Sequence, residues 1–302
     1  MFIEAERIFT ARTKDIKNIV KIKKPSIEAA KDFEDRSLDM VYIDAEHDED
    51  SIRDDIRAWR PKIKFGGWLA GHDFQLPYIQ KILNEEGFLR ITTAPDNSWI
   101  VPVPSISLVA VACTKVPETL IALRKCMDQM QFNRVMLFTH EDVEAEGIDV
   151  IKTEKLDYRG YNEFVAMKLW KWVATDYALV VQNDGYITDA SKWSDDFFYF
   201  DYVGAPWPPS THYTKEGGEV RVGNGGFSLR SKKLLRAPTV LGLEFSDYDT
   251  GFPHEDGFLC VHNRERLEKH GIQFAPVEIA AHFSTELTVP ETTESFGKHK
   301  YL

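Results

Sequence analysis

The chain has 302 residues, 43% of them hydrophobic, which is enough for two domains that each bury a core. Its formal net charge of −11 disfavours nucleic acid or an anionic membrane as a general partner, and its longest apolar run, residues 106–113, is too short to span a membrane. Three widely spaced cysteines and an N-terminus without an apolar signal core favour a reducing, cytoplasmic location.

The first part of the chain alternates strand-like and helix-like segments. We expect strands at residues 19–22, 40–43 and 68–71, and helices at 51–59 and 77–86. Pro102 and Pro104 then form a short stiff connector. We therefore expect a first α/β module over residues 1–104 and a second domain over residues 105–302.

Two motifs in the first module end strands in acidic or histidine side chains. Residues 39–47 read D-x-V-x-I-D-x-x-H, and residues 66–73 read G-G-x-x-x-x-H-D. Together they resemble the C-terminal half of class I S-adenosylmethionine (SAM)-dependent methyltransferases. The resemblance implies a partial Rossmann-like methyltransferase module. Asp44 and Asp73 could pair at the strand ends to hold a metal, or they are relic residues in a structural module.

The cofactor-binding part of that family is missing here. Methyltransferases of this class hold SAM with a Gly-rich turn after their first strand, and no such turn precedes Ile19. We therefore expect a truncated or remnant module, and we do not expect it to bind SAM or transfer a methyl group.

The alternation restarts after the connector. We expect strands at residues 107–113, 134–139, 148–151 and 177–181, and helices at 117–129, 162–173 and 258–270, the last stopped by Gly271. Strands that alternate with helices predict a parallel or mixed sheet covered on both faces.

Asp184 follows the buried strand 177–181, and Gly185 lets the backbone turn there. Ligands of parallel α/β sheets bind at the carboxyl ends of the strands, and a carboxylate at that edge suits a divalent cation that holds a phosphorylated substrate. The alternative is that Asp184 only begins a turn.

Further motifs extend from this strand to the C-terminus. They are Q-x-D-G at 182–185, D-Y-V-G-A-P-W at 201–207, V-G-N-G-G-F-S-L-R at 222–230 and H-E-D at 254–256, with F-G-K-H at 296–299. In this order they resemble an uncharacterised family of glycosyltransferases with the GT-A fold. The resemblance covers Ile106 to the end of the chain and implies a nucleotide-sugar donor.

GT-A enzymes commonly hold Mn²⁺ or Mg²⁺ with a D-x-D motif, of which this chain keeps only Asp184. Asp184 would then bind both the metal and the donor diphosphate. By the same resemblance His299 is a second metal ligand, and an imidazole ligand favours Mn²⁺. Thr114 lies where the resemblance places the nucleotide.

The remaining candidates serve the sugar and the acceptor. Asp256 is the candidate base, kept ionised at a helix start, and Glu255 would hold the acceptor; the alternative is that both acids cap the helix. Asn224, Gly225 and Gly226 would let the backbone approach the sugar, or they form a tight turn. Trp207 either stacks on the sugar or packs in the core.

We therefore expect a metal-assisted, inverting glycosyltransferase that moves a sugar from a nucleoside-diphosphate donor to a glycan or other hydroxyl acceptor. Two alternatives remain: a SAM-dependent methyltransferase with an incomplete cofactor site, and a catalytically inactive module that binds a sugar or nucleotide. The oligomeric state stays open.

Overall fold

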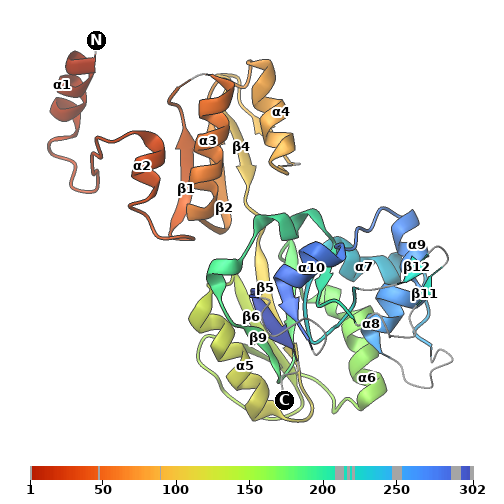
Figure 1. Cartoon of the computed structure of the whole chain (residues 1–302). Coiled ribbons are helices and arrows are strands. Elements are labelled where there is room, and N and C mark those ends of the chain that lie inside the picture. Colours follow the sequence, from red (N-terminus) through yellow and green to blue (C-terminus); the bar gives the residue numbers. More distant parts are fainter. Residues whose placement is uncertain are drawn as a thin grey trace.

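The computed structural model describes residues 2–46, 48–88, 90–207, 214–215, 218–219, 222–246, 254–286 and 294–299. The predicted α/β class is confirmed. Two α/β parts, each with its own main sheet, are joined by a short connection from β4 to β5 (Figure 1).

The first sheet has the strand order β1-β2-β4-β3 among the described residues. Its strands are β1 (Leu38–Ile43), β2 (Ile63–Gly71), β3 (Thr92–Thr93) and β4 (Trp99–Pro102), and only the β1–β2 pairing is parallel. Helices α3 (Glu49–Trp59) and α4 (Pro77–Glu85) pack against each other, and Ile56, Ile79 and Ile82 fill the core beneath them.

The other face of this sheet is exposed, so the expectation of cover on both faces is wrong here. Met40 and Tyr42 of β1 are each 48% exposed, and Trp68, which lies beside Met40 in the β1–β2 register, is 44% exposed. Side chains alternate between faces along a strand. Because α3 and α4 take one face, the alternate residues of β1 and β2 remain on the surface.

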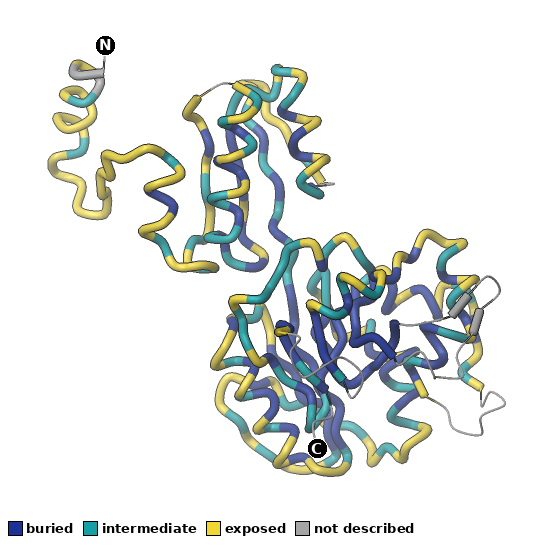
Figure 2. Tube along the Cα trace, viewed as in Figure 1, coloured by how far each residue is buried: buried dark blue, intermediate teal, exposed yellow. Residues whose placement is uncertain are grey.

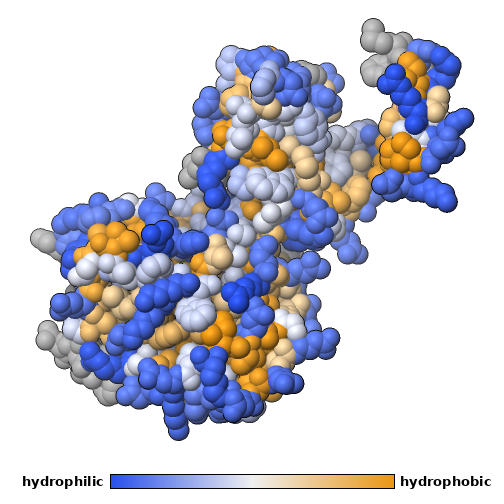
Figure 3. All heavy atoms as spheres, turned by 180° about the vertical axis from the view of Figure 1, so that it is seen from behind, coloured by the Kyte–Doolittle hydropathy of each residue, from blue (hydrophilic) through white to orange (hydrophobic). Residues whose placement is uncertain are grey.

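Residues 19–22 are not a strand, contrary to the expectation from their β-branched composition. They lie in an arm that carries α1 (Phe2–Thr13) away from the first sheet and is joined to it through α2 (Ser26–Ala30) (Figure 1). Val20 is 82% exposed, and hydrophobic side chains lie along the arm's surface (Figure 3). A strand needs a neighbour to pair its backbone groups, and this arm runs beside none.

The second sheet has the order β10-β13-β8-β5-β6-β7 among the described residues. Its strands are β5 (Ile106–Val111), β6 (Arg134–Thr139), β7 (Asp149–Lys152), β8 (Tyr177–Val181), β10 (Tyr202–Gly204) and β13 (Phe227–Ser231). Strands β5 to β8 are parallel, and β13 runs antiparallel between β8 and β10. The predicted mixed sheet is confirmed.

Residues of β5 alternate between two hydrophobic clusters. Leu108 and Ala110 pack into the larger cluster and Val109 and Val111 into the smaller one, and all four are buried (Figure 2). This strand is therefore covered on both faces, as its continuous apolar run predicts.

The helices of the second part mostly confirm the predicted segments. α5 (Val116–Gln129) has Pro117 in its first turn. α6 (Tyr158–Glu163) continues through a π-helical turn (Phe164–Lys168) and a 3₁₀ turn (Leu169–Lys171), so it begins earlier than expected. α8 (Glu255–Gly257), a π-helical turn (Phe258–His262) and α9 (Arg264–Lys269) form the predicted third helix, which stops before Gly271 at φ +79°.

The remaining elements are short or lie at the periphery. They are α7 (Lys232–Val240), α10 (Val277–Phe283), the hairpin β11 (Thr214–Lys215) with β12 (Gly218–Glu219), and 3₁₀ turns at Arg60–Lys62, Ala190–Lys192 and Asp195–Tyr199.

A small third sheet brings the C-terminal segment to the end of β8. Its order is β14-β15-β9, with β9 (Gly185–Ile187), β14 (Ser284–Thr285) and β15 (Gly297–His299). In the antiparallel β15–β9 register, His299 lies opposite Gly185. Residues far apart in the sequence thus meet beside Asp184.

A buried ionic cluster joins the two parts. Asp195 of the second part lies 2.6 Å from Arg36 Nη2 and 2.7 Å from Arg60 Nε, both of the first part. Trp193 donates to the same carboxylate at 2.8 Å, and its ring packs edge-on against Phe65. Burial opposes a charge on Asp195, but the two arginines outweigh it and lower the pKa of the carboxyl.

Among the described residues, no helix combines the length and apolar character that a membrane crossing requires.

The Asp195 cluster predicts a pH-dependent stability. Because its pKa is lower in the folded chain than the unfolded value of about 3.9, Asp195 stabilises the fold above that value, and this contribution is lost as the pH falls through the folded pKa. We expect Asp195→Asn to lower the free energy of unfolding at pH 7 by about 3 kcal/mol. Urea titrations from pH 6 to pH 3 should then show a shallower acid loss in Asp195→Asn than in the natural chain. An identical pH slope in both proteins would contradict this role.

Candidate functional site

A cavity of about 400 Å³ lies where β8 ends and β13 begins. Because these strands are antiparallel, the glycine loop before β13 meets the residues that follow β8, and Gln182 N–H donates to Gly226 O at 2.9 Å. The cavity is lined by Tyr158, Tyr161, Asn162, Gln182, Trp207, Asn224, Gly225, Gly226, His254, Glu255, Asp256, Glu286 and His299. Most of the residues selected from the sequence therefore share one cavity.

Asp184 and His299 come into contact beside this cavity. His299 Nε2 lies 3.3 Å from Asp184 Oδ1, and His299 Nδ1 lies 3.5 Å from Glu286 Oε1. The His299 side chain is 5% exposed, whereas that of Asp184 is 38% exposed. Asp184 is not among the residues that line the cavity and adjoins it through His299. Burial opposes a charge on His299, but the two carboxylates outweigh it and raise the pKa of the imidazole.

The donor atoms of Asp184 and His299 fit a divalent cation. Two ligands at about 2.1 Å on neighbouring positions of an octahedral ion lie about 3 Å apart, close to the separation seen here. One carboxylate oxygen and one imidazole nitrogen suit Mn²⁺ better than Mg²⁺, which prefers oxygen ligands alone.

The glycine loop packs tightly against the protein's own side chains. A Cβ on Gly225 would lie 1.7 Å from Glu255 Oε1, and one on Gly226 would lie 2.0 Å from His299 Nε2. A Cβ on Gly223 would lie 1.9 Å from the Trp207 ring. These glycines therefore leave room for the side chains of Glu255, His299 and Trp207, and their approach to a sugar stays a prediction.

Asn224 and Trp207 are both largely buried at the edge of the cavity. Asn224 adopts a left-handed backbone conformation (φ +57°), and its Oδ1 accepts from Gly226 N–H at 3.2 Å. Trp207 is 7% exposed and its ring packs over Gly223, as a core residue would. It also lines the cavity, so both alternatives for Trp207, packing and stacking on a sugar, remain.

Glu255 forms a buried ion pair, and its expected contact with the acceptor stays a prediction. Its two carboxylate oxygens each lie 2.9 Å from a terminal nitrogen of Arg230, and Arg230 is fully buried. Burial raises the pKa of the Glu255 carboxyl, and the Arg230 charge opposes the rise. Arg230 also donates to Gly225 O at 3.3 Å, so the pair ties the glycine loop to the start of α8.

Asp256 is half-buried and lines the cavity. Its Oδ2 accepts from Gly225 N–H at 3.1 Å, and its Oδ1 accepts from Gly257 N–H at 2.7 Å. The N-cap residue of α8 is His254, but Asp256 accepts an N–H of the first helical turn, so the capping alternative stays open for Asp256. Of the two acids, Asp256 is the one without a cation on its carboxylate in the contacts of the described residues, and it is the better candidate base.

Sequence reasoning missed several residues of this cavity. Tyr158 OH lies 2.7 Å from His254 Nδ1, Gln182 donates to Tyr161 OH at 2.7 Å, and Glu286 adjoins His299. Arg230 could have been selected from the sequence, because an arginine inside a buried strand requires an anionic partner. Glu286 could not, since only the pairing of β14 with β15 brings it next to His299.

Thr114 lies apart from the cavity lining. It is exposed in the loop between β5 and α5, at the same edge of the sheet as the end of β8. Its contact with a nucleotide stays a prediction.

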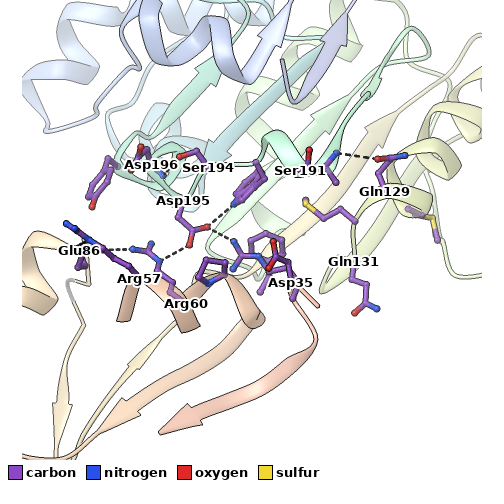
Figure 4. A pocket seen from close by; sticks show the side chains of 18 of the residues that line it. Asp35, Arg57, Arg60, Glu86, Gln129, Gln131, Ser191, Ser194, Asp195 and Asp196 are labelled. Atoms are coloured by element: carbon purple, nitrogen blue, oxygen red, sulfur yellow. Dashed lines mark hydrogen bonds and ion pairs between the residues drawn. The ribbon is translucent and has the colours of Figure 1, made fainter. Parts of the chain in front are cut away.

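A larger cavity of about 800 Å³ lies at the junction of the two parts (Figure 4). The three arginines that line it among the described residues each have an acidic partner: Arg36 and Arg60 pair with Asp195, and Arg57 pairs with Glu86 at 2.9 Å. None of the site residues selected from the sequence lines it among the described residues. We therefore assign the candidate site to the smaller cavity.

The first part contains a separate group of possible metal ligands. One atom each from Asp44, His72 and Asp73 lies within 4.8 Å of the others, so the strand ends bring together the residues of the two methyltransferase-like motifs. His47 of the first motif lies outside the described residues. Asp44 is exposed, and exposed acidic groups are common without an ion.

Residues 148–299, half of the chain, match the family described as a protein of unknown function (DUF5672), and the chain belongs to this family. Residues 4–74 match a family described as a methyltransferase domain, in agreement with the resemblance of the first motifs. Among curated proteins no relative matches the chain.

Solved structures with partial similarity include glycosyltransferases. The galactosyltransferase LgtC in complex with donor and acceptor sugar analogs has 14% identity and a TM-score of 0.41, over 64% of this chain and 86% of that one. A glycosyltransferase involved in glycosylation of the major capsid of PBCV-1 has 13% identity and a TM-score of 0.42, over 65% and 93%. Similarity at these scores gives no evidence about the donor, the metal or the mechanism. The function is therefore inferred from the residues of the candidate cavity.

The Arg230–Glu255 pair predicts a strongly coupled pair of substitutions. Arg230→Met alone leaves a buried carboxylate without its cation and should lower the free energy of unfolding by roughly 3–5 kcal/mol. Arg230→Met combined with Glu255→Leu removes both charges and should cost much less than the two single changes together. Urea unfolding of the three variants measures this coupling. A double variant that costs the full sum would contradict it.

Proposed function

We propose that the chain transfers a glycosyl group from a nucleoside-diphosphate sugar to an acceptor hydroxyl. One observation carries the proposal: Asp256, the glycine loop and His299 line a single cavity, and Asp184 contacts His299 at its edge. The motifs that contain these residues occur in the same order as in GT-A glycosyltransferases. Sugar transfer by such enzymes uses a base for the acceptor hydroxyl and ligands for a metal ion, and Asp256, Asp184 and His299 are of these types.

Asp256 serves as the general base in this proposal. It would accept the proton of the acceptor hydroxyl as that oxygen forms a bond to the anomeric carbon, while the bond from this carbon to the donor diphosphate breaks. Attack from the side opposite the leaving group inverts the anomeric configuration. The Gly225 and Gly257 N–H groups orient the Asp256 carboxylate, and its other lone pairs remain for the hydroxyl.

Asp184 and His299 would hold a divalent cation, which when bound neutralises charge on the leaving diphosphate. Two features of the fold place His299 beside Asp184. Gly226 gives the His299 ring room, and the β15–β9 pairing holds His299 beside the end of β8. The Arg230–Glu255 pair fixes the glycine loop relative to α8, so that Asp256 and His299 keep their places around one cavity.

Replacement of the base tests the catalytic assignment. Asp256→Asn keeps the shape of the side chain but cannot accept a proton, so we expect kcat for sugar transfer to fall by about 10²–10⁴-fold with little change in donor KM. Asp142→Asn, which changes an almost fully exposed carboxylate, is the matched control. Full transfer activity in Asp256→Asn would refute the inverting mechanism with this base.

Replacement of the first metal ligand tests the donor site. In the presence of Mn²⁺, a panel of nucleoside diphosphates should raise the melting temperature of the natural chain, because ligands that bind only the folded state stabilise it. Asp184→Ala should fold normally and lose this metal-dependent increase. An unchanged increase in Asp184→Ala would show that the diphosphate binds elsewhere.

A further inference from the structure

Glu286 is a partly buried acid that belongs to no sequence motif. It follows β14, whose Thr285 pairs with Lys298 of β15, so that the backbone places Glu286 next to His299. Its side chain is 13% exposed and lines the candidate cavity. A carboxylate in such a place loses much of its hydration and requires compensating contacts.

The two carboxylates around His299 contact opposite nitrogens of its ring. Glu286 Oε1 lies 3.5 Å from Nδ1, and Asp184 Oδ1 lies 3.3 Å from Nε2. The lone pairs of the two nitrogens point away from each other, so an ion shared by Asp184 and His299 must bind Nε2. Glu286 faces the nitrogen that such an ion leaves uncoordinated.

We propose that Glu286 is a positioning residue that accepts the Nδ1–H of His299 and so presents the Nε2 lone pair to a divalent cation beside Asp184. The inference rests on the proposed function and deepens it. Histidines that bind metals generally donate their other ring N–H to a carboxylate or carbonyl, which selects the tautomer and orients the ring.

Packing against the ring face supports the same orientation. A Cβ on Gly226 would lie 2.0 Å from His299 Nε2 and 2.4 Å from two ring carbons, so the ring lies flat on the glycine backbone. The ring contacts this loop with one face and Glu286 at Nδ1, and the β15–β9 pairing fixes its backbone. Little freedom remains for the imidazole to turn Nδ1 towards Asp184.

Direct metal binding tests the proposal without an activity assay. Isothermal titration and the electron paramagnetic resonance signal of free Mn²⁺ would measure Mn²⁺ binding to the full chain. Glu286→Ala removes the acceptor and should weaken Mn²⁺ binding roughly 10- to 100-fold. Glu286→Gln keeps a neutral acceptor of the same shape and should lie between Glu286→Ala and the natural chain. Glu294→Gln removes one charge from an exposed residue paired with Lys192 and should leave the affinity unchanged.

Nitrogen-15 spectroscopy of the histidine ring separates positioning from a general structural role. In the natural chain with saturating Mg²⁺, His299 should be protonated at Nδ1 and not at Nε2. In Glu286→Ala that preference should weaken although the chain stays folded. If Glu286→Ala does not fold, the Mn²⁺ affinity and the His299 protonation state are both measured on Glu286→Gln.

The outcomes separate this inference from the proposed function. Mn²⁺ binding to the natural chain with equal affinity in Glu286→Gln and Glu286→Ala would overturn the role of Glu286 and leave the metal site intact. No Mn²⁺ binding to the natural chain would overturn the metal site itself, and the role of Glu286 with it.

Discussion

The candidate site depends on the pairing of β15 with β9. Gly185 to Ile187 follow directly after Asp184, and their antiparallel partner Gly297–His299 comes from the far end of the chain. This short ladder places His299 against Asp184, and the parallel pairing of β14 with β15 adds Glu286 on the other side of the ring. Without it, the end of β8 would present one carboxylate and no second ligand.

A second constraint holds the catalytic half of the cavity. The buried Arg230–Glu255 pair joins β13 to α8 and also binds the glycine loop, and Asp256 accepts from the same loop. Burial makes this pair costly to break, because either charge left alone would lack both water and a partner. Both acids line the cavity, but Glu255 is paired with Arg230, whereas the contacts of the described residues place no cation on Asp256.

Elements set by local patterns could be predicted from the sequence, and contacts set by tertiary pairing could not. Continuous apolar runs bounded by turn residues give β6 and β8 with the expected bounds, and α5 begins at its predicted proline turn. Residues 19–22 have the same β-branched character but no neighbouring strand, so composition alone misplaces them. Asp184, Asp256 and His299 were found through motifs. Glu286 was not, because only the β14–β15 register relates it to the site.

The central claim is that Asp184 and His299 together hold a divalent cation at the end of β8. Diffraction from crystals soaked with Mn²⁺ and a nucleoside diphosphate, collected at a wavelength where manganese scatters anomalously, tests it most directly. We expect one anomalous peak about 2.0–2.6 Å from both Asp184 and His299 Nε2, with diphosphate oxygens on its open side. A peak confined to Asp44, His72 and Asp73, or diphosphate bound without any peak beside His299, would contradict the account.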